Sequence, residues 1–342
     1  MLFIEREIAI DLGTSGTQVY VRGKGVILRE PTVVAVDRSS GRLLKVGEDA
    51  QKMLGRTPAN IVAIHPITAG VISDYDMTAQ FLKDLISRVT SFSLFKPSVI
   101  VCVPGSITGV EERAVIDATI EAGARKVYLL ESSVAASTGA GIDISRPDGH
   151  MVIDVGGGTT EVAVVSLGGV VECESIKIAG SAFDDAIVKY IRRKHNVLIG
   201  KRTAEDLKIN IGCVYPRNDV GPQDVKGRSL ISGLPQEVEV TPSDIQEALQ
   251  EPVEEIMDAI HLVLERTPPE LVADLASNGI VMSGGGSLLP GLDKLVTSRT
   301  GIEAAVVDDP ISCAAYGAGK MIRELDNMQE GMINLARRKQ MK

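Results

Sequence analysis

The chain of 342 residues lacks an excess of positive charge. It contains 36 lysines and arginines against 45 aspartates and glutamates, which gives a formal net charge of −9. A surface that binds duplex nucleic acid needs clustered lysine and arginine to neutralise phosphates, so the composition excludes this class of function. One basic cluster near the C-terminus, Arg337-Arg338-Lys339, indicates either a solvated tail or a contact with anionic lipid.

Cysteine and histidine are too few and too scattered to form a metal site. The four cysteines are Cys102, Cys173, Cys213 and Cys313, and the four histidines are His65, His150, His195 and His261. No pair has the spacing of zinc ligands. We expect the cysteines to be buried free thiols in a reducing cytosol.

Long apolar segments are also missing. No stretch approaches the roughly 20 apolar residues of a membrane span. Glu5, Arg6 and Glu7 interrupt the apolar start of the chain, so the N-terminus does not have the pattern of a signal peptide. With 44% hydrophobic and 24% charged residues, the composition is that of a globular protein. The length of 342 residues predicts more than one domain. We therefore expect a cytoplasmic protein with at most peripheral membrane contact.

One short sequence motif, called the repeated phrase, occurs twice in the chain. Residues 8–17 and 152–161 each read as an apolar strand, an aspartate, and a turn rich in glycine and threonine. A turn with small side chains brings backbone N–H groups close to a phosphate, and the aspartates, Asp11 and Asp154, can hold a hydrated metal at its rim. The two copies predict two half-molecules that face one polyphosphate.

Each copy of the phrase is followed by a predicted hairpin, at residues 18–28 and 161–173. This repetition indicates an internal duplication of one α/β unit. Between the copies we expect strands at 98–103 and 124–130 and helices at 110–121 and 134–140. The alternation of strands and helices predicts an α/β fold with its ligand between two lobes.

A third glycine turn follows the apolar strand that begins at Gly279. Its glycines either let the backbone approach a flat base and ribose or form a plain flexible turn. Because none of the three turns contains the lysine of a Walker motif, a P-loop NTPase is excluded. Glu205 and Lys208 share one face of a helix that we expect Thr203 to cap, and they form either a surface ion pair or a clamp on a nucleoside.

The two Asp-Gly-Thr turns and the Ser-Gly-Gly-Gly-Ser segment resemble the phosphate and adenosine motifs of the actin, sugar-kinase and heat-shock-chaperone superfamily. Over essentially its full length the chain resembles bacterial actins of the MreB/Mbl type. The stretches that carry this resemblance are residues 8–14, 22–25, 60–74, 151–167, 200–208, 266–271 and 283–291. The resemblance implies an actin-like two-lobed fold of duplicated ribonuclease-H-like domains, with a nucleotide cleft between the lobes.

The resemblance also implies a division of the chain. A first lobe would cover residues 1–145, with a small subdomain inserted at about 33–67. A second lobe would cover 146–315, with a subdomain inserted at about 182–242. Residues 316–342 would form a C-terminal helix that returns to the first lobe, followed by the basic tail.

The ligands implied by the resemblance are ATP and Mg²⁺. Asp11 and Asp154 would position the hydrated magnesium. The residues expected at the nucleotide are Gly13, Thr14, Ser15 and Gly16, then Gly157, Gly158 and Thr159, then Glu205, Asp206, Leu207 and Lys208, and finally Ser283, Gly284, Gly285 and Gly286. Gly16 stands where the family usually has asparagine, which removes one polar contact to phosphate.

The chain departs from the family at the position of the residue that activates water. After the strand that ends at Leu130 the family reads Glu-Glu-Pro, and its second glutamate orients the attacking water. This chain has Glu131, Ser132 and Ser133 instead. Loss of such a group typically costs roughly 10²–10⁴-fold in rate, so we hypothesise that the protein binds ATP but hydrolyses it slowly. Two alternatives remain: Glu131 substitutes, or another residue fills the role.

A loop before the strand at Ser98 is a candidate for membrane contact. It contains Phe92, Leu94 and Phe95, and MreB-type proteins use a loop at this position to touch lipid. Burial against the neighbouring helix is the alternative.

The resemblance further implies filaments on the inner face of the cell membrane that organise wall synthesis and cell shape. These would contain this chain alone or with paralogues, and would bind wall-synthesis proteins of the MreC/MreD/RodZ type. Two other functions remain open, a small-molecule kinase of the same superfamily and an actin-like scaffold that does not determine shape.

Overall fold

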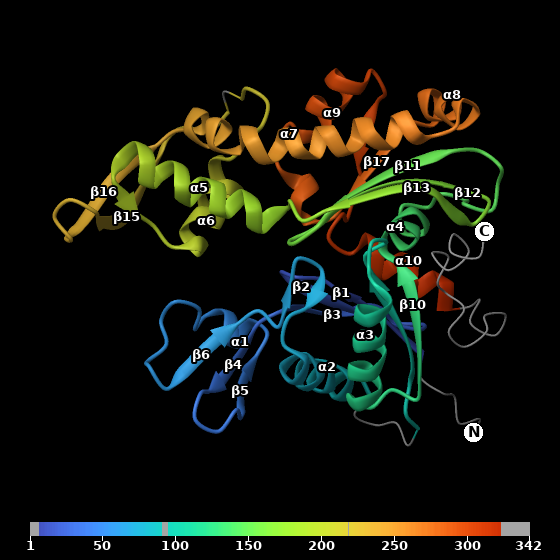
Figure 1. The fold of residues 1–342 in the computed structure, drawn as a ribbon, viewed down its shortest axis with the longest axis horizontal. Helices are drawn as coiled ribbons and strands as arrows, with labels where there is room; N and C mark the ends of the chain where they lie inside the picture. Colours follow the sequence, from blue (N-terminus) through green and yellow to red (C-terminus); the bar gives the residue numbers. More distant parts are fainter. Residues whose placement is uncertain (1–6, 91–94, 218, 323–342) are drawn as a thin grey trace.

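The computed structural model describes residues 7–90, 95–217 and 219–322. Figure 1 shows two lobes, with the N-terminal half of the chain in the lower one and most of the C-terminal half in the upper one. Each lobe is built around a five-stranded sheet. Residues 1–6, 91–94, 218 and 323–342, which include the basic cluster at Arg337, lie outside the described residues.

The two sheets have the same strand order and the same strand directions. The first is β10-β9-β1-β2-β3 and the second is β13-β12-β11-β17-β18. In each, three antiparallel strands are followed by two that run parallel to the first. The strands are β1 (Glu7–Leu12), β2 (Gly16–Val21), β3 (Gly25–Pro31), β9 (Ser98–Val103), β10 (Lys126–Glu131), β11 (His150–Val155), β12 (Thr160–Ser166), β13 (Gly169–Ile176), β17 (Ile280–Ser283) and β18 (Ala304–Val306). The duplication predicted from the repeated phrase is present.

The central strands are apolar throughout because both of their faces are buried. All six residues of β9 are buried. Val99 and Val101 belong to the core under the outer helices α2 (Tyr75–Thr90) and α3 (Gly109–Glu121). Ile100 and Cys102 belong to a second cluster on the opposite face, between the lobes. A strand covered on both sides has no solvent face for polar residues, which explains the continuous apolar run.

Two short helices, α4 (Ser132–Gly139) and α10 (Cys313–Met321), join the lobes. Helix α4 follows the first sheet but packs on β11 and β12, whereas α10 follows the second sheet and packs on β1 and β2. Their contact depends on glycine: a Cβ on Gly317 would lie 1.7 Å from the carbonyl oxygen of Ala135, and one on Gly139 would lie 2.0 Å from that of Cys313. The backbones of the two helices therefore touch directly.

A small sheet projects from each lobe. In the first lobe it has the order β5-β4-β6, and in the second β14-β15-β16. The elements of the first projection and its surroundings are β4 (Val34–Asp37), β5 (Leu43–Val46), α1 (Glu48–Gln51), β6 (Ile61–Ile64), β7 (Ile67–Thr68) and β8 (Val71–Ile72). Those of the second are α5 (Gly180–His195), β14 (Val197–Leu198), α6 (Lys201–Ile211), β15 (Gln223–Ser229) and β16 (Pro235–Val240).

The remaining helices complete the second lobe. They are α7 (Pro242–Arg266), α8 (Pro269–Asn278), the 3₁₀ helix η1 (Gly285–Leu288) and α9 (Leu292–Thr300). Helix α7 begins with a capping box in which Thr241 accepts the N–H of Asp244 and the Asp244 carboxylate accepts the N–H of Thr241. It lies with α5 over the outer face of the second sheet. The glycine turns predicted from the sequence lie on the opposite, inner side of this sheet, between the lobes.

Candidate functional site

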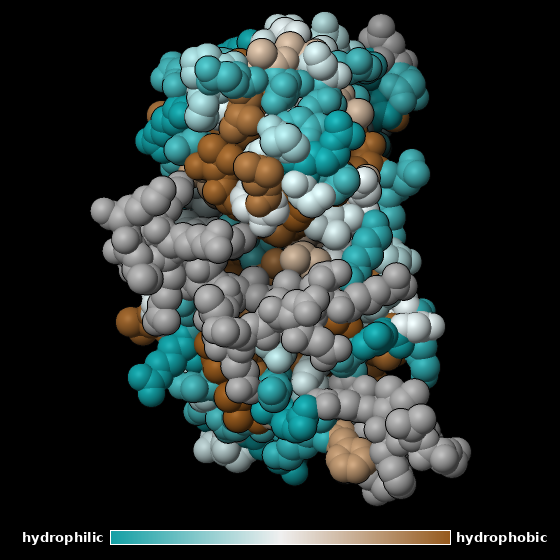
Figure 2. Space-filling model, turned by 90° about the vertical axis from the view of Figure 1, so that its right-hand side faces the viewer, coloured by the Kyte–Doolittle hydropathy of each residue, from teal (hydrophilic) through white to brown (hydrophobic). Residues whose placement is uncertain are grey.

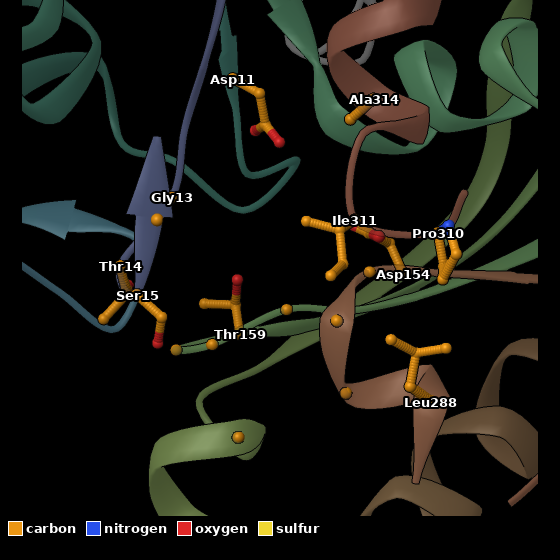
Figure 3. Close-up of a pocket in the computed structure, with 18 of the residues that line it drawn as sticks. Asp11, Gly13, Thr14, Ser15, Asp154, Thr159, Leu288, Pro310, Ile311 and Ala314 are labelled. Atoms are coloured by element: carbon orange, nitrogen blue, oxygen red, sulfur yellow. The ribbon is translucent and has the colours of Figure 1, made fainter. Parts of the chain in front are cut away.

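A cavity of about 490 Å³ lies between the two lobes. All three glycine turns predicted from the sequence reach it, and Figure 3 shows residues of the first two turns on facing elements. The residues predicted at the nucleotide that line the cavity are Gly13, Thr14, Ser15, Gly16, Gly157, Gly158, Thr159, Glu205, Lys208, Gly284, Gly285 and Gly286. The volume is in the range of pockets that enclose a small organic ligand.

The first and second turns touch each other. A Cβ on Gly157 would lie 2.0 Å from the Oγ of Ser15, and one on Gly158 would lie 2.3 Å from the Oγ1 of Thr14. Glycine at these two positions lets the turns approach closely. The Oγ1 of Thr14 also accepts the N–H of Gly70, at 2.9 Å, which fixes its rotamer. Backbone N–H groups without bulky neighbours make this end of the cavity suited to phosphate.

Asp11 and Asp154 both line the cavity from opposite lobes. Burial, and then repulsion by Asp154, raise the pKa of Asp11 to about 7. Burial also raises the pKa of Asp154, although the Oγ of Ser283 donates a hydrogen bond to its Oδ1 at 2.7 Å and opposes this shift. A cation beside the pair would favour both ionised forms. Ser283 does not line the cavity itself. It contributes to the site only through its hydrogen bond to Asp154.

The donor set at this pair fits magnesium better than a metal caged by protein. Among residues 7–90, 95–217 and 219–322, no three or more His, Cys, Asp and Glu side chains gather where they could hold a metal. Two carboxylates next to a phosphate site suit Mg²⁺, which usually keeps several waters and binds protein through one or two carboxylates.

Helix α6 reaches the cavity with two of its four predicted residues. Lys208 pairs with Asp184 on α5, with 2.7 Å between Nζ and Oδ1, and donates to the carbonyl oxygen of Gly180 at 3.2 Å. From their spacing, Lys208 was considered as the partner of Glu205 on the same helix. In the structure it pairs instead with Asp184 on the neighbouring helix α5. Burial raises the pKa of Asp184 to about 6, against the opposing charge of Lys208.

The structure does not bring the other two α6 residues into the cavity. Leu207 is fully buried in the core of the second lobe, and Asp206 is exposed. The prediction that Thr203 caps this helix was wrong. Helix α6 begins at Lys201, and its N-cap is Gly200, three residues before Thr203 and without a side-chain cap. Thr203 therefore lies inside the first turn of the helix.

Apolar residues that were not among the predicted site residues form much of the remaining lining. They are Phe183, Ile209, Leu288, Leu289, Pro290, Pro310 and Ile311. Figure 3 shows Leu288, Pro310 and Ile311 across the cavity from Thr14 and Ser15. Gln18 donates from Nε2 to the carbonyl oxygen of Ile311, at 2.7 Å, and ties the first lobe to this segment. The position of Leu288 and Leu289, directly after the third glycine turn, could have marked them as candidates for the site. Nothing in the sequence near Pro310 indicates a site.

Ser132, which the resemblance placed where a water-orienting glutamate was expected, lines the cavity as the first residue of α4. Its Oγ donates to the carbonyl oxygen of Val103 at 3.2 Å. Glu131, the alternative, is the N-cap residue of α4 and is not part of the cavity wall.

A further carboxyl group near this wall was missed. Glu161 on β12 is 2% exposed, and its Oε1 accepts the N–H of Gly105 at 2.6 Å. Burial raises its pKa to about 8; the N–H of Gly105 opposes the shift, and Asp154 and Glu131 add to it. A signal was available, because Glu161 is an acidic residue in an apolar strand. The structure places it opposite Asp154, on the neighbouring strand β11.

The loop predicted to touch lipid is only partly described. Phe92 and Leu94 lie outside the described residues, and Phe95 is 51% exposed. On the side of the molecule seen in Figure 2, hydrophobic side chains form separate areas divided by hydrophilic ones. In the described part of the chain, no helix is long and apolar enough to span a membrane.

Comparison with solved structures defines the class of protein. The chain matches MreB5 of Spiroplasma citri bound to AMPPNP with a TM-score of 0.90 and 35% identity, over 94% of this chain and 97% of that one. It matches the MamK double helical filament with a TM-score of 0.81 and 20% identity, over 94% and 99% of the two chains, a likeness that concerns the fold alone. The predicted actin-like two-lobed α/β fold is confirmed.

Comparison of sequences gives the family. The family described as MreB/Mbl protein matches residues 5–330. The cell shape-determining protein Mbl of Bacillus subtilis (strain 168) is 45% identical over 330 residues, which cover 96% of this chain and 99% of the relative. The cell shape-determining protein MreB of Escherichia coli (strain K12) is 47% identical over 326 residues, or 94% of each. The chain belongs to the MreB/Mbl family, as its motifs predicted.

Proposed function

We propose that this chain is an ATP-binding, cell-shape-determining bacterial actin that assembles into filaments. The observation that carries the proposal is the cavity between the lobes, where two glycine turns and two carboxylates meet an apolar surface. The names of its relatives support the role in cell shape. Related structures bound to AMPPNP and to ADP support a nucleotide as the ligand.

The residues of the cavity divide into three roles. The turns at Gly13–Gly16 and Gly157–Thr159 would bind the phosphates through backbone N–H and hydroxyl groups. Asp11 and Asp154 would hold magnesium, which when bound neutralises charge on the phosphates. The apolar surface around Leu288 and Ile311, with Lys208 and the third turn, would hold the nucleoside.

We further propose that hydrolysis is slow. Ser132 lines the cavity at the position of the missing glutamate, and its hydroxyl is engaged with the carbonyl oxygen of Val103. A serine hydroxyl is a much weaker base than a carboxylate and does not accept a proton from water as a carboxylate does. The resting filament would therefore retain ATP for longer than that of a relative with the glutamate.

The filaments are proposed to lie on the cytoplasmic face of the cell membrane and to bind wall-synthesis proteins of the MreC/MreD/RodZ type. The exposure of Phe95 supports a lipid contact at the loop before β9. One weak contact in each subunit is multiplied along a filament, so that many subunits together bind strongly.

Assembly and hydrolysis can be tested on the same sample by pelleting with electron microscopy and by phosphate release. We expect ATP-dependent filaments, slow phosphate release, and an increase of roughly 10²-fold in that rate for Ser132→Glu. Ser132→Gln is the matched control, because it has the same size as glutamate without the charge. Absence of ATP-dependent filaments would contradict the proposed function. A wild-type rate equal to that of a relative with the glutamate, unchanged in Ser132→Glu, would contradict slow hydrolysis.

A further inference from the structure

Glu161 connects the second lobe to the first at the edge of the cavity. It belongs to β12 of the second sheet, and its Oε1 accepts the N–H of Gly105, which follows β9 of the first sheet. The N–H of Ser133, at the start of α4, acts on the same carboxyl group and favours its ionised form.

The two N–H groups belong to residues that follow neighbouring strands of the first sheet at equivalent positions. Strands β9 and β10 are parallel and in register, with Val103 opposite Glu131. Gly105 and Ser133 each lie two residues beyond this pair, so the carboxyl ends of both strands converge on one side chain. The residues between, Pro104 and Ser132, are the ones that line the cavity.

Stability alone does not account for a carboxyl group at this position. The neighbours of Glu161 on β12, Val162, Ala163 and Val164, are fully buried and apolar. In the described part of the chain the Oε2 of Glu161 has no hydrogen-bond partner. A buried polar group that is only half satisfied is destabilising compared with an apolar residue of similar shape.

We propose that Glu161 is a positioning residue of the nucleotide site. Its carboxyl group tethers the second lobe to Gly105, beside the start of α4, and so holds the wall at Pro104 and Ser132 in place beside the phosphate turns. The proposal rests on the proposed function and extends it, because the wall held in this way is where the hydrolytic water would be bound. Ser133 contributes through an N–H that proline, the family's residue at this position, does not have.

Two substitutions separate the acceptor oxygen from the shape of the side chain. Glu161→Gln keeps an oxygen that can accept the N–H of Gly105, and Glu161→Met has a similar length without one. Hydrogen exchange of the peptide that contains Gly105, in nucleotide-free protein, reads the tether directly. We expect exchange at least about tenfold faster in Glu161→Met and close to wild type in Glu161→Gln. Single-turnover phosphate release should fall about tenfold in Glu161→Met, with ATP affinity changed by less than about twofold.

Glu172→Met, on the neighbouring strand β13, is the matched control and should change neither exchange nor rate. If Glu161→Met does not fold, Glu161→Val tests the same point, because a β-branched residue matches Val162 and Val164 on the strand. Unchanged exchange at Gly105 overturns the tether. Faster exchange with an unchanged rate, or with an equal loss of affinity, overturns the positioning role. Because exchange is measured without nucleotide, a wild type that binds no ATP refutes the proposed function separately and leaves the tether to be decided by exchange.

Discussion

Adding a single methyl group where α4 and α10 cross should destabilise the protein. In Gly317→Ala, the new Cβ would lie 1.7 Å from the carbonyl oxygen of Ala135 and 2.6 Å from the backbone nitrogen of Gly139. Carbon and oxygen in contact normally lie about 3.3–3.6 Å apart, so the helices must separate by roughly 1.5 Å. Because the clashing atoms are backbone, no change of rotamer relieves the overlap.

The magnitude follows from two opposing effects. Overpacking costs about 1–3 kcal/mol, and we expect the upper end here because a whole helix must move. Alanine regains about 1 kcal/mol of helix propensity over glycine, which leaves a net destabilisation of about 2 kcal/mol. With a urea dependence of about 2 kcal/mol per M, the unfolding midpoint should fall by about 1 M. ATP affinity should also fall, since Ser132 and Ala314, near the starts of the two helices, line the cavity.

Urea unfolding followed by circular dichroism checks the first effect, and titration with a fluorescent ATP analogue checks the second. Gly109→Ala is the matched control, because Gly109 also lies in a helix but a Cβ there would meet nothing within 4 Å. Its midpoint should be unchanged or slightly higher. If Gly317→Ala unfolds at the same urea concentration as Gly109→Ala and binds ATP as well, the inferred contact between the helix backbones is wrong.

Two further outcomes are expected. The pKa of Asp11, about 7, and that of Glu161, about 8, lie above their ordinary values of 3.8 and 4.5, so the folded state binds more protons than the unfolded state between about pH 4 and 8 and loses stability as pH rises through this range. From pH 6 to pH 8 the loss of unfolding free energy attributable to Asp11 is about 1 kcal/mol. The urea midpoint of the wild type should fall over this range, and that of Asp11→Asn should fall less. A wild-type midpoint that rises with pH would contradict this assignment. In liposome flotation, Leu94→Ser combined with Phe95→Ser should reduce binding, whereas Val110→Ser, which changes a residue that is 82% exposed elsewhere, should not; equal flotation of both variants would remove the loop as a lipid contact.

Several features of the site could be predicted from the sequence because they depend on local backbone geometry. Gly157 and Gly158 stand in a turn whose small side chains already indicate a close approach, and the cavity between the lobes uses them in this way. The aspartates at the ends of β1 and β11 were placed for the same reason. The partner of Lys208 could not be predicted, because Asp184 lies on another helix and spacing along one helix favoured Glu205.

Apart from the two facing glycine turns, contacts between segments far apart in the chain could not be predicted from the sequence. Glu161 looked like an isolated polar residue in a strand until the fold placed Gly105 against it. The segment at Pro310 and Ile311 carries no motif, and it lines the cavity because α10 begins just after it.

The sequence by itself determined the duplicated α/β unit and the three glycine turns, because apolar periodicity and turn composition are local properties that act within a few residues. The resemblance of its motifs, rather than periodicity, indicated the family. Only the tertiary structure decided the other contacts between distant segments. The crossing of α4 and α10, the pair of Lys208 and Asp184, and the bond between Glu161 and Gly105 each join segments that are distant in the chain. Such contacts depend on how two sheets and their helices pack, and packing brings together residues whose chemistry no local pattern records.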